Sequence, residues 1–310
     1  MKRIITALTL TLALVGLGLG CRKPKTGVDK GISAAELTAT ADKQMKEGKF
    51  AEARLTLRHL EQYLPGSPEF PKAKLMLGDS FFFQATASYP EAEVEYTSFL
   101  NYFPRHELRD YALYHRALCH FSSIESAERD QAETRKALDG FQQLLTESPG
   151  SPYAGEARAK ILQCWRRIAE HELVVGVFYV NQYFYPGAER RLKSLLENHP
   201  DNVDRERAYY YLGEAMRQRL PGVEDLTQFN KEYALKLQKE DLKDLDKAQI
   251  AQYSKDLEAF SAERIKGYRA EAKNYYQKLV ESYPGSEWAR RAADRLITMG
   301  TSNVKEELDS

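Results

Sequence analysis

The sequence predicts an all-α solenoid of about five helical hairpins with a C-terminal capping helix. Five times along the chain, an alanine stands twelve residues before a proline that ends a helical run. These pairs are Ala53/Pro65, Ala92/Pro104, Ala137/Pro149, Ala188/Pro200 and Ala272/Pro284. Large apolar residues stand eight and five residues before each proline. They are Leu57, Tyr96, Phe141, Leu192 and Tyr276, and then Leu60, Phe99, Leu144, Leu195 and Leu279. Because these offsets place all three columns on one helical face, each set describes the second helix of a repeated hairpin.

The first copy, residues 34–67, fits the tetratricopeptide repeat without gaps. It has Ala41 in the first helix, Gly48 at the turn, Ala53 where the two helices cross and Pro65 at the end. A small residue lets the helices approach, and a proline cannot continue the second helix. The pattern therefore predicts a tetratricopeptide solenoid.

The first helices of the later hairpins are recognised by their spacing from the preceding proline. We expect their cores around residues 75–83, 112–124, 157–168 and 207–220. A capping helix is expected over residues 286–299, because a solenoid must cover its last apolar face.

The last of the four intervals between these prolines is unusually long. Pro200 and Pro284 are 84 residues apart, whereas the other intervals are 39, 45 and 51 residues. We expect a charged helical insertion at about residues 221–263, within a solenoid spanning residues 34–299 and followed by a polar tail at 300–310. The apolar residues of the insertion are spaced among many charged ones, which favours a protruding amphipathic helix over disorder. The insertion is either a solvated extension or a contact surface for a partner.

The N-terminus predicts export. Lys2 and Arg3 precede an uncharged apolar stretch at residues 4–19, which is shorter than the roughly twenty residues of a membrane span and typical of a secretory signal.

The end of this stretch, residues 17–21, resembles a bacterial lipoprotein signal, in which a cysteine becomes the lipidated first residue. We expect a signal peptide at residues 1–20, lipid attachment at Cys21 and a polar tether at residues 21–33. The alternative is an ordinary secretory signal followed by a chance cysteine. More than one acyl chain on Cys21 would give stable membrane anchoring.

Composition and motifs argue against nucleic-acid binding and against an enzyme. The formal net charge is zero, so no strong field favours nucleic acid. His171 and Glu172 begin like a zinc helix motif, but Val175 replaces the second histidine. Cys119 and Cys164 occupy equivalent positions that select small residues, and we expect them to be unpaired core cysteines. No catalytic residue, cofactor site or metal site is expected.

Three stretches resemble one known family, BamD, the lipoprotein of the β-barrel assembly machinery of diderm bacteria. They are Glu147-Ser-Pro-Gly-Ser-Pro-Tyr-Ala154, Ile168-Ala-Glu-His-Glu-Leu-Val-Val-Gly-Val-Phe-Tyr179 and Tyr185-Pro-Gly-Ala-Glu-Arg-Arg-Leu192. The resemblance covers roughly residues 34–218, leaves out the insertion and resumes at about residue 262.

The resemblance implies a non-catalytic scaffold, anchored by lipid in the outer membrane and facing the periplasm. Its implied partners are the β-barrel insertase, accessory lipoproteins and unfolded outer-membrane proteins. The peptide-groove candidates on early first helices are Phe82, Phe83, Tyr114 and Phe121, some of which could instead pack against a neighbouring repeat. The insertase-contact candidates are Arg190 and Arg191. The alternative function is a tetratricopeptide lipoprotein scaffold for pilus or secretin assembly or for cell-wall coordination.

Overall fold

The computed structural model describes residues 31–198, 204–239 and 241–308, which form twelve helices and no strand. The expected signal peptide, Cys21 and most of the tether therefore lie outside the described residues. Four consecutive hairpins are formed by α1 (Ala34–Lys46) with α2 (Phe50–Tyr63), α3 (Phe70–Phe82) with α4 (Tyr89–Tyr102), α5 (Arg109–Ser122) with α6 (Ala132–Glu147), and α7 (Ala154–Asn181) with α8 (Tyr185–Asn198).

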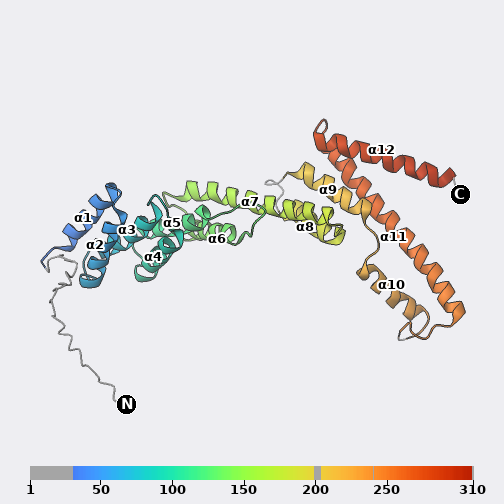
Figure 1. Cartoon of the computed structure of the whole chain (residues 1–310), viewed down its shortest axis with the longest axis horizontal. Coiled ribbons are helices and arrows are strands. Elements are labelled where there is room, and N and C mark those ends of the chain that lie inside the picture. The colour runs from blue at the N-terminus through green and yellow to red at the C-terminus, as the bar shows by residue number, and fades with distance from the viewer. Residues whose placement is uncertain (1–30, 199–203, 240, 309–310) are drawn as a thin grey trace, which may run out of the picture.

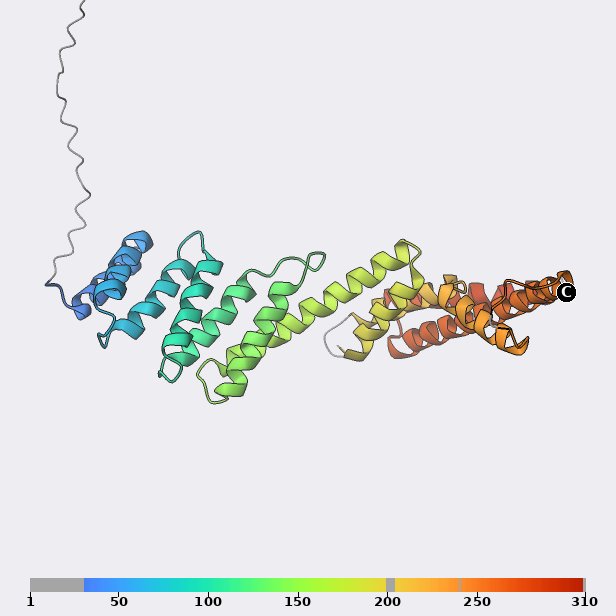
Figure 2. The ribbon, with the colours of Figure 1, turned by 90° about the horizontal axis from the view of Figure 1, so that it is seen from below.

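The last repeat is formed by α9 (Arg205–Gln218) and α11 (Lys247–Ser282), and α12 (Glu287–Leu308) packs against both of these helices. Helix α10 (Val223–Lys236) stands between α9 and α11 in the sequence. The hairpins stack in chain order into an elongated array, with α1 near one end and α12 at the other (Figure 1, Figure 2).

The three predicted columns form the core between the helices of each hairpin. All five crossing alanines, from Ala53 to Ala272, have no exposed area, and the same holds for the ten large residues of the other two columns. The predicted all-α solenoid is confirmed, because the repeated pattern is buried in every copy.

In two of the hairpins, a glycine of the first helix packs directly against a tyrosine ring of the second helix. A Cβ atom added to Gly78 would lie 2.6 Å from the Tyr96 ring, and one added to Gly213 would lie 2.4 Å from the Tyr276 ring. Both rings are fully buried and cannot move aside. Only glycine therefore allows the first and second helices to approach this closely at these two positions.

Helix α7 is longer than its expected core at residues 157–168, because it continues to Asn181. The added turns bury Leu173, Val177 and Val180, so the apolar stripe persists. No proline occurs between Pro152 and Pro186, so nothing ends the helix earlier.

The C-terminal helices also extend further than expected. The region expected as an insertion consists of α10 and the first part of α11, which then continues without interruption as the second helix of the last repeat. Asp246 caps the start of α11 and Gln249 completes a capping box. Helix α12 runs to Leu308, past the expected end at Met299 and into the region expected as a polar tail. None of the described helices has the length and apolar content needed to cross a membrane.

Candidate binding surfaces

Five aromatic side chains gather on, or directly beside, the first helices of the second, third and fourth repeats. We call this group, Phe82, Phe83, Tyr111, His115 and Tyr153, the aromatic face. His115 stands at its centre, with ring centroids 3.9 Å from Tyr111, 5.8 Å from Phe82 and 6.1 Å from Phe83. The centroid of Tyr153 lies 6.2 Å from that of His115. The helices α3, α5 and α7 thus bring together rings that are far apart in the sequence.

The four groove candidates do not all belong to this face. Phe82 and Phe83 contact each other with centroids 4.9 Å apart, and Phe83 is 52% exposed. Tyr114 is buried, and its hydroxyl donates a hydrogen bond to Glu156. Phe121 lies near the other end of α5 under the ammonium of Lys160. The structure therefore brings Phe82 and Phe83 together on an accessible surface, makes Tyr114 a packed support and separates Phe121 from them.

Asp79 is a functional candidate that the sequence reasoning missed. Its Oδ1 atom accepts hydrogen bonds from the hydroxyls of Tyr96 and Tyr111, each 2.7 Å long. Burial raises the pKa of this carboxyl group to about 6, although both hydrogen bonds favour the charged form. Asp79 therefore lies beside the aromatic face as a partly buried carboxylate.

The sequence does contain a signal for this arrangement. Gly78-Asp79 and Gly213-Glu214 each stand thirteen and fourteen residues after a repeat-ending proline. In both repeats, a tyrosine occupies the column eight residues before the next proline. Glycine, acid and tyrosine together predict a tyrosine ring packed on the glycine with its hydroxyl on the acid.

Glu214 in the last repeat is surrounded differently from Asp79. It accepts a hydrogen bond of 2.7 Å from Tyr276, as Asp79 does from Tyr96. Two guanidinium groups also contact it, Arg217 at 2.8 Å and Arg295 at 2.7 Å. Burial acts to raise the pKa of Glu214, but hydrogen bonds from Arg217 and Tyr276 hold it below its ordinary value. Glu214 is thus a neutralised carboxylate that ties α9 to α11 and α12.

The insertase-contact candidates lie side by side on α8. Both Arg190 and Arg191 are exposed. Arg191 places its Nη1 atom 3.0 Å and 2.9 Å from the two carboxylate oxygens of Glu172 on α7. Arg190 makes no ion pair within the part of the chain that the structure describes. Arg191 therefore joins two of the family-like stretches, and Arg190 presents its charge to solvent.

His171 and the two cysteines have packing roles. The Nδ1 atom of His171 donates to the carbonyl oxygen of Ala127, so His171 anchors the segment between α5 and α6. Cys119 and Cys164 are free and buried, and burial raises their pKa values to about 12 and about 11. Because the thiolate is the reactive form, both cysteines are unreactive. Among the described residues, no group of three or more potential ligands is placed to hold a metal ion.

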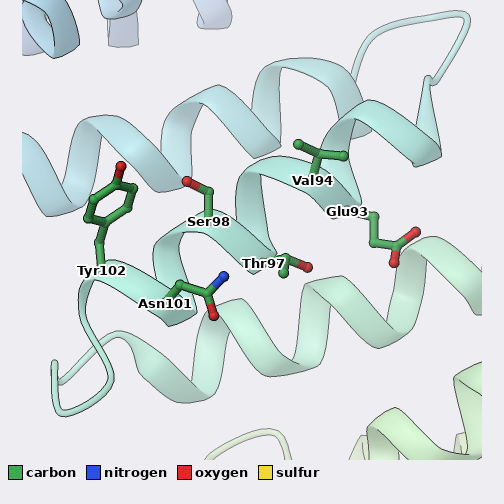
Figure 3. A pocket seen from close by; sticks show the side chains of 6 residues that line it. All are labelled: Glu93, Val94, Thr97, Ser98, Asn101 and Tyr102. Atoms are coloured by element: carbon green, nitrogen blue, oxygen red, sulfur yellow. The ribbon is translucent and has the colours of Figure 1, made fainter.

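Two hollows on the surface are lined by other residues. One, of about 540 Å³, follows the outer side of α4 and is lined by one helix alone (Figure 3). Its lining residues are Glu93, Val94, Thr97, Ser98, Asn101 and Tyr102. A second hollow of about 290 Å³ lies where α7, α9 and α12 meet, and includes Tyr183, Tyr210 and Arg291. Neither contains the arrangement of nucleophile, base and orienting group that acid–base or nucleophilic catalysis uses.

The fold and these surfaces define a repeat protein that acts by binding. Residues 31–231 match the model of a family described as outer membrane lipoprotein (YfiO), and residues 259–286 match a tetratricopeptide repeat. The chain therefore belongs to this outer membrane lipoprotein family and is associated with the outer membrane. Neither of these two matches covers residues 232–258, which include the end of α10 and the start of α11.

Relatives named outer membrane protein assembly factor BamD share about a quarter of their residues with this chain. The protein from Haemophilus influenzae is 28% identical over 209 residues, which cover 64% of this chain and 78% of the relative. That from Caulobacter vibrioides is 28% identical over 211 residues, or 68% of each chain. That from Rickettsia prowazekii is 27% identical over 212 residues, covering 68% of this chain and 84% of the relative. The chain is thus a BamD-family protein, and this family consists of assembly factors rather than enzymes.

Proposed function

We propose that this protein is a scaffold for the assembly of outer-membrane proteins, held at the periplasmic side of the outer membrane by lipid on Cys21. The observation that carries the proposal is the match of residues 31–231 to a family whose relatives are named assembly factors. The stacked hairpins, which offer extended surfaces for protein partners, support it.

The C-terminal repeats would bind the β-barrel insertase. Arg190 is exposed on α8 with no ion-pair partner among the described residues, so it can contact an acidic group without breaking a bond in this chain. Arg191 is half-exposed and already paired with Glu172. Arg190 is therefore the better candidate for a direct contact, and Arg191 supports the α7–α8 hairpin that presents it.

The aromatic face would receive an extended segment of an unfolded outer-membrane protein. Phe83 is half-exposed at the end of α3, and the rings of Phe82 and His115 lie behind it. Exposed aromatic rings on a rigid helical support suit a strand whose alternate side chains are apolar.

The first test is recovery of partners from gently solubilised envelopes. The native lipoprotein is isolated and the proteins that accompany it are identified by mass spectrometry. We expect stoichiometric recovery of a large β-barrel protein with periplasmic domains. Recovery of a secretin, a pilin or a cell-wall enzyme in its place would transfer the function to a different envelope scaffold.

Site-directed photo-crosslinking tests whether the aromatic face binds unfolded outer-membrane proteins, the clients of the proposed scaffold. A photoreactive phenylalanine analogue at position 83 should capture a radiolabelled unfolded outer-membrane protein. The matched control is the same analogue at Leu55, which is 74% exposed on α2. Equal capture at the two positions would contradict a specific client site.

A further inference from the structure

Asp79 lacks the positive partners that its counterpart in the last repeat has. The two carboxylates are equivalent in the repeat, since each follows a glycine and accepts a hydrogen bond from the buried tyrosine of the same hairpin. Glu214 is contacted by Arg217 and Arg295. No lysine or arginine of the described residues contacts Asp79, and its two hydrogen-bond donors are neutral hydroxyls. Because carboxylates withdrawn from water are normally paired with cations, Asp79 is ready to accept one from outside the chain.

One oxygen of Asp79 is available for such a partner. Both tyrosine hydroxyls donate to Oδ1. Oδ2 accepts no hydrogen bond from any described residue, and the residue is only partly buried. A donor that arrives at the aromatic face can therefore bond to Oδ2 without displacing Tyr96 or Tyr111.

The charges around the aromatic face also favour binding of a cation. Burial, and then the negative charges of Glu156, Asp79 and Asp110 on three different helices, raise the pKa of Tyr153, which lies just before α7. Elsewhere in the described chain, basic side chains lie over aromatic rings, as Arg54 does over Phe81 and Lys160 over Phe121. No such cation covers a ring of the aromatic face in the described residues. Aromatic rings attract cations through their negative faces, so rings and carboxylates together favour a positively charged group.

We propose that the aromatic face, with Asp79 at its base, binds an arginine or lysine side chain of an extended peptide segment, with its charged end on Asp79 Oδ2 and its stem on the rings. The inference rests on the proposed client-binding function and adds a chemical preference to it. A guanidinium or ammonium group supplies both the hydrogen bond and the charge that this carboxylate lacks.

Other occupants fit less well. An anionic group such as a lipid phosphate would be repelled by Asp79, Asp110 and Glu156. A metal ion would find one free carboxylate oxygen at Asp79, since the neighbouring hydroxyls act as donors to it. A basic side chain needs only one strong acceptor and the aromatic surface beside it.

Binding of matched peptides to the purified full-length lipoprotein in detergent tests the inference. The probes are fluorescent twelve-residue peptides of alternating valine and threonine that end in phenylalanine. One contains a single arginine, and the other contains citrulline, which has the same shape but no charge. We expect the arginine peptide to bind about tenfold more tightly to the wild-type protein, as for one hydrogen bond between charged groups.

Two variants locate the effect. Asp79→Asn keeps an oxygen acceptor for Tyr96 and Tyr111 but removes the charge, and it should bind both peptides equally, with the affinity of the citrulline peptide. Asp139→Asn removes one exposed charge on α6 and should keep the tenfold preference. Circular dichroism of each variant confirms that the helices are intact.

The outcomes separate the two proposals. If both peptides bind the wild-type protein equally well, the preference for a basic side chain is overturned while client binding stands. If neither binds, client binding at this face is overturned together with the inference. If Asp79→Asn retains the tenfold preference, the cation binds elsewhere and the assignment to Asp79 is wrong.

Discussion

Replacing Asp79 by asparagine should stabilise the protein at neutral pH, although it removes a hydrogen-bonded carboxylate from between two repeats. Burial raises the pKa of Asp79 from its ordinary value of 3.8 to about 6. Each pKa unit corresponds to about 1.4 kcal/mol, so ionising Asp79 in the folded protein lowers the free energy of unfolding by about 3 kcal/mol at most. Asparagine carries no charge at any pH and avoids this cost.

The effect has a defined sign and pH range. Because the pKa of Asp79 is higher in the folded than in the unfolded chain, its protonated form contributes stability that is fully present below pH 3.8. This contribution is lost as the pH rises through about 6. Tyr96 and Tyr111, whose pKa values are also raised by burial, stay protonated throughout. The difference between the Asp79→Asn variant and the wild type should therefore grow between these two pH values and stay constant above them.

Tryptophan fluorescence can follow the relevant repeats alone. Trp165 packs against the apolar cluster that includes Tyr96, whereas Trp288 belongs to the cluster of the last repeat. In a Trp288→Phe background, urea unfolding followed at Trp165 reports the cluster next to Asp79. The experiment is run from pH 4 to pH 8 with and without Asp79→Asn. A difference that does not change with pH, or an asparagine variant that is less stable at pH 8, would refute the reasoning.

Three further predictions concern other parts of the chain. Gly78→Ala should lower the free energy of unfolding by about 1–3 kcal/mol in the same urea titration, because the new methyl group would overlap the fixed Tyr96 ring. The control is Gly66→Ala, which should change the free energy of unfolding little, because no atom lies within 4 Å of the new methyl group. Deleting residues 224–261 should reduce recovery of the insertase in a pull-down but leave the melting of the repeats nearly unchanged, because Phe229, Tyr233, Tyr253 and Phe260 pack mainly on one another; intact recovery would show that the insertion is not a partner surface. Cys21→Ala should release the mature chain from membranes or leave an unprocessed precursor, and unchanged size and membrane partition in fractionated cells would argue against the lipid anchor.

The core of each hairpin could be predicted from the sequence, because a repeated spacing is evidence from five copies at once. Ala92, Tyr96 and Phe99 are each ordinary residues, but their common distances from Pro104 identify a buried face that the structure confirms. Helix ends were less predictable. No proline marks where α7 stops, and Pro284 marks only the C-terminal end of α11, so the end of α7 and the start of α11 could not be read from the repeat pattern.

The binding surface was only partly predictable for the same reason. Phe82 and Phe83 could be chosen as candidates from their helix, but the role of Tyr114 depends on a hydrogen bond to Glu156 in the next repeat. Whether a carboxylate such as Asp79 is neutralised depends on which residues of other helices lie near it. That information comes from the stacking angle of the repeats and not from their pattern.

Helix α11 gives the end of the solenoid the properties of a lever. Its 36 residues extend about 54 Å, from a tip beside α10 to Ser282, and include the buried Ala272 and Tyr276 of the last repeat. Because one continuous hydrogen-bonded helix forms both the tip and the buried part, a partner that moves the tip also moves the buried part of α11 relative to α9 and α12. Gly267 is the one glycine in this helix, it is exposed, and it lies just before Tyr268, where the helix enters the repeat. The helix is therefore easiest to bend at Gly267. Replacing Gly267 by alanine would stabilise the helical conformation at this position by about 1 kcal/mol and so oppose bending.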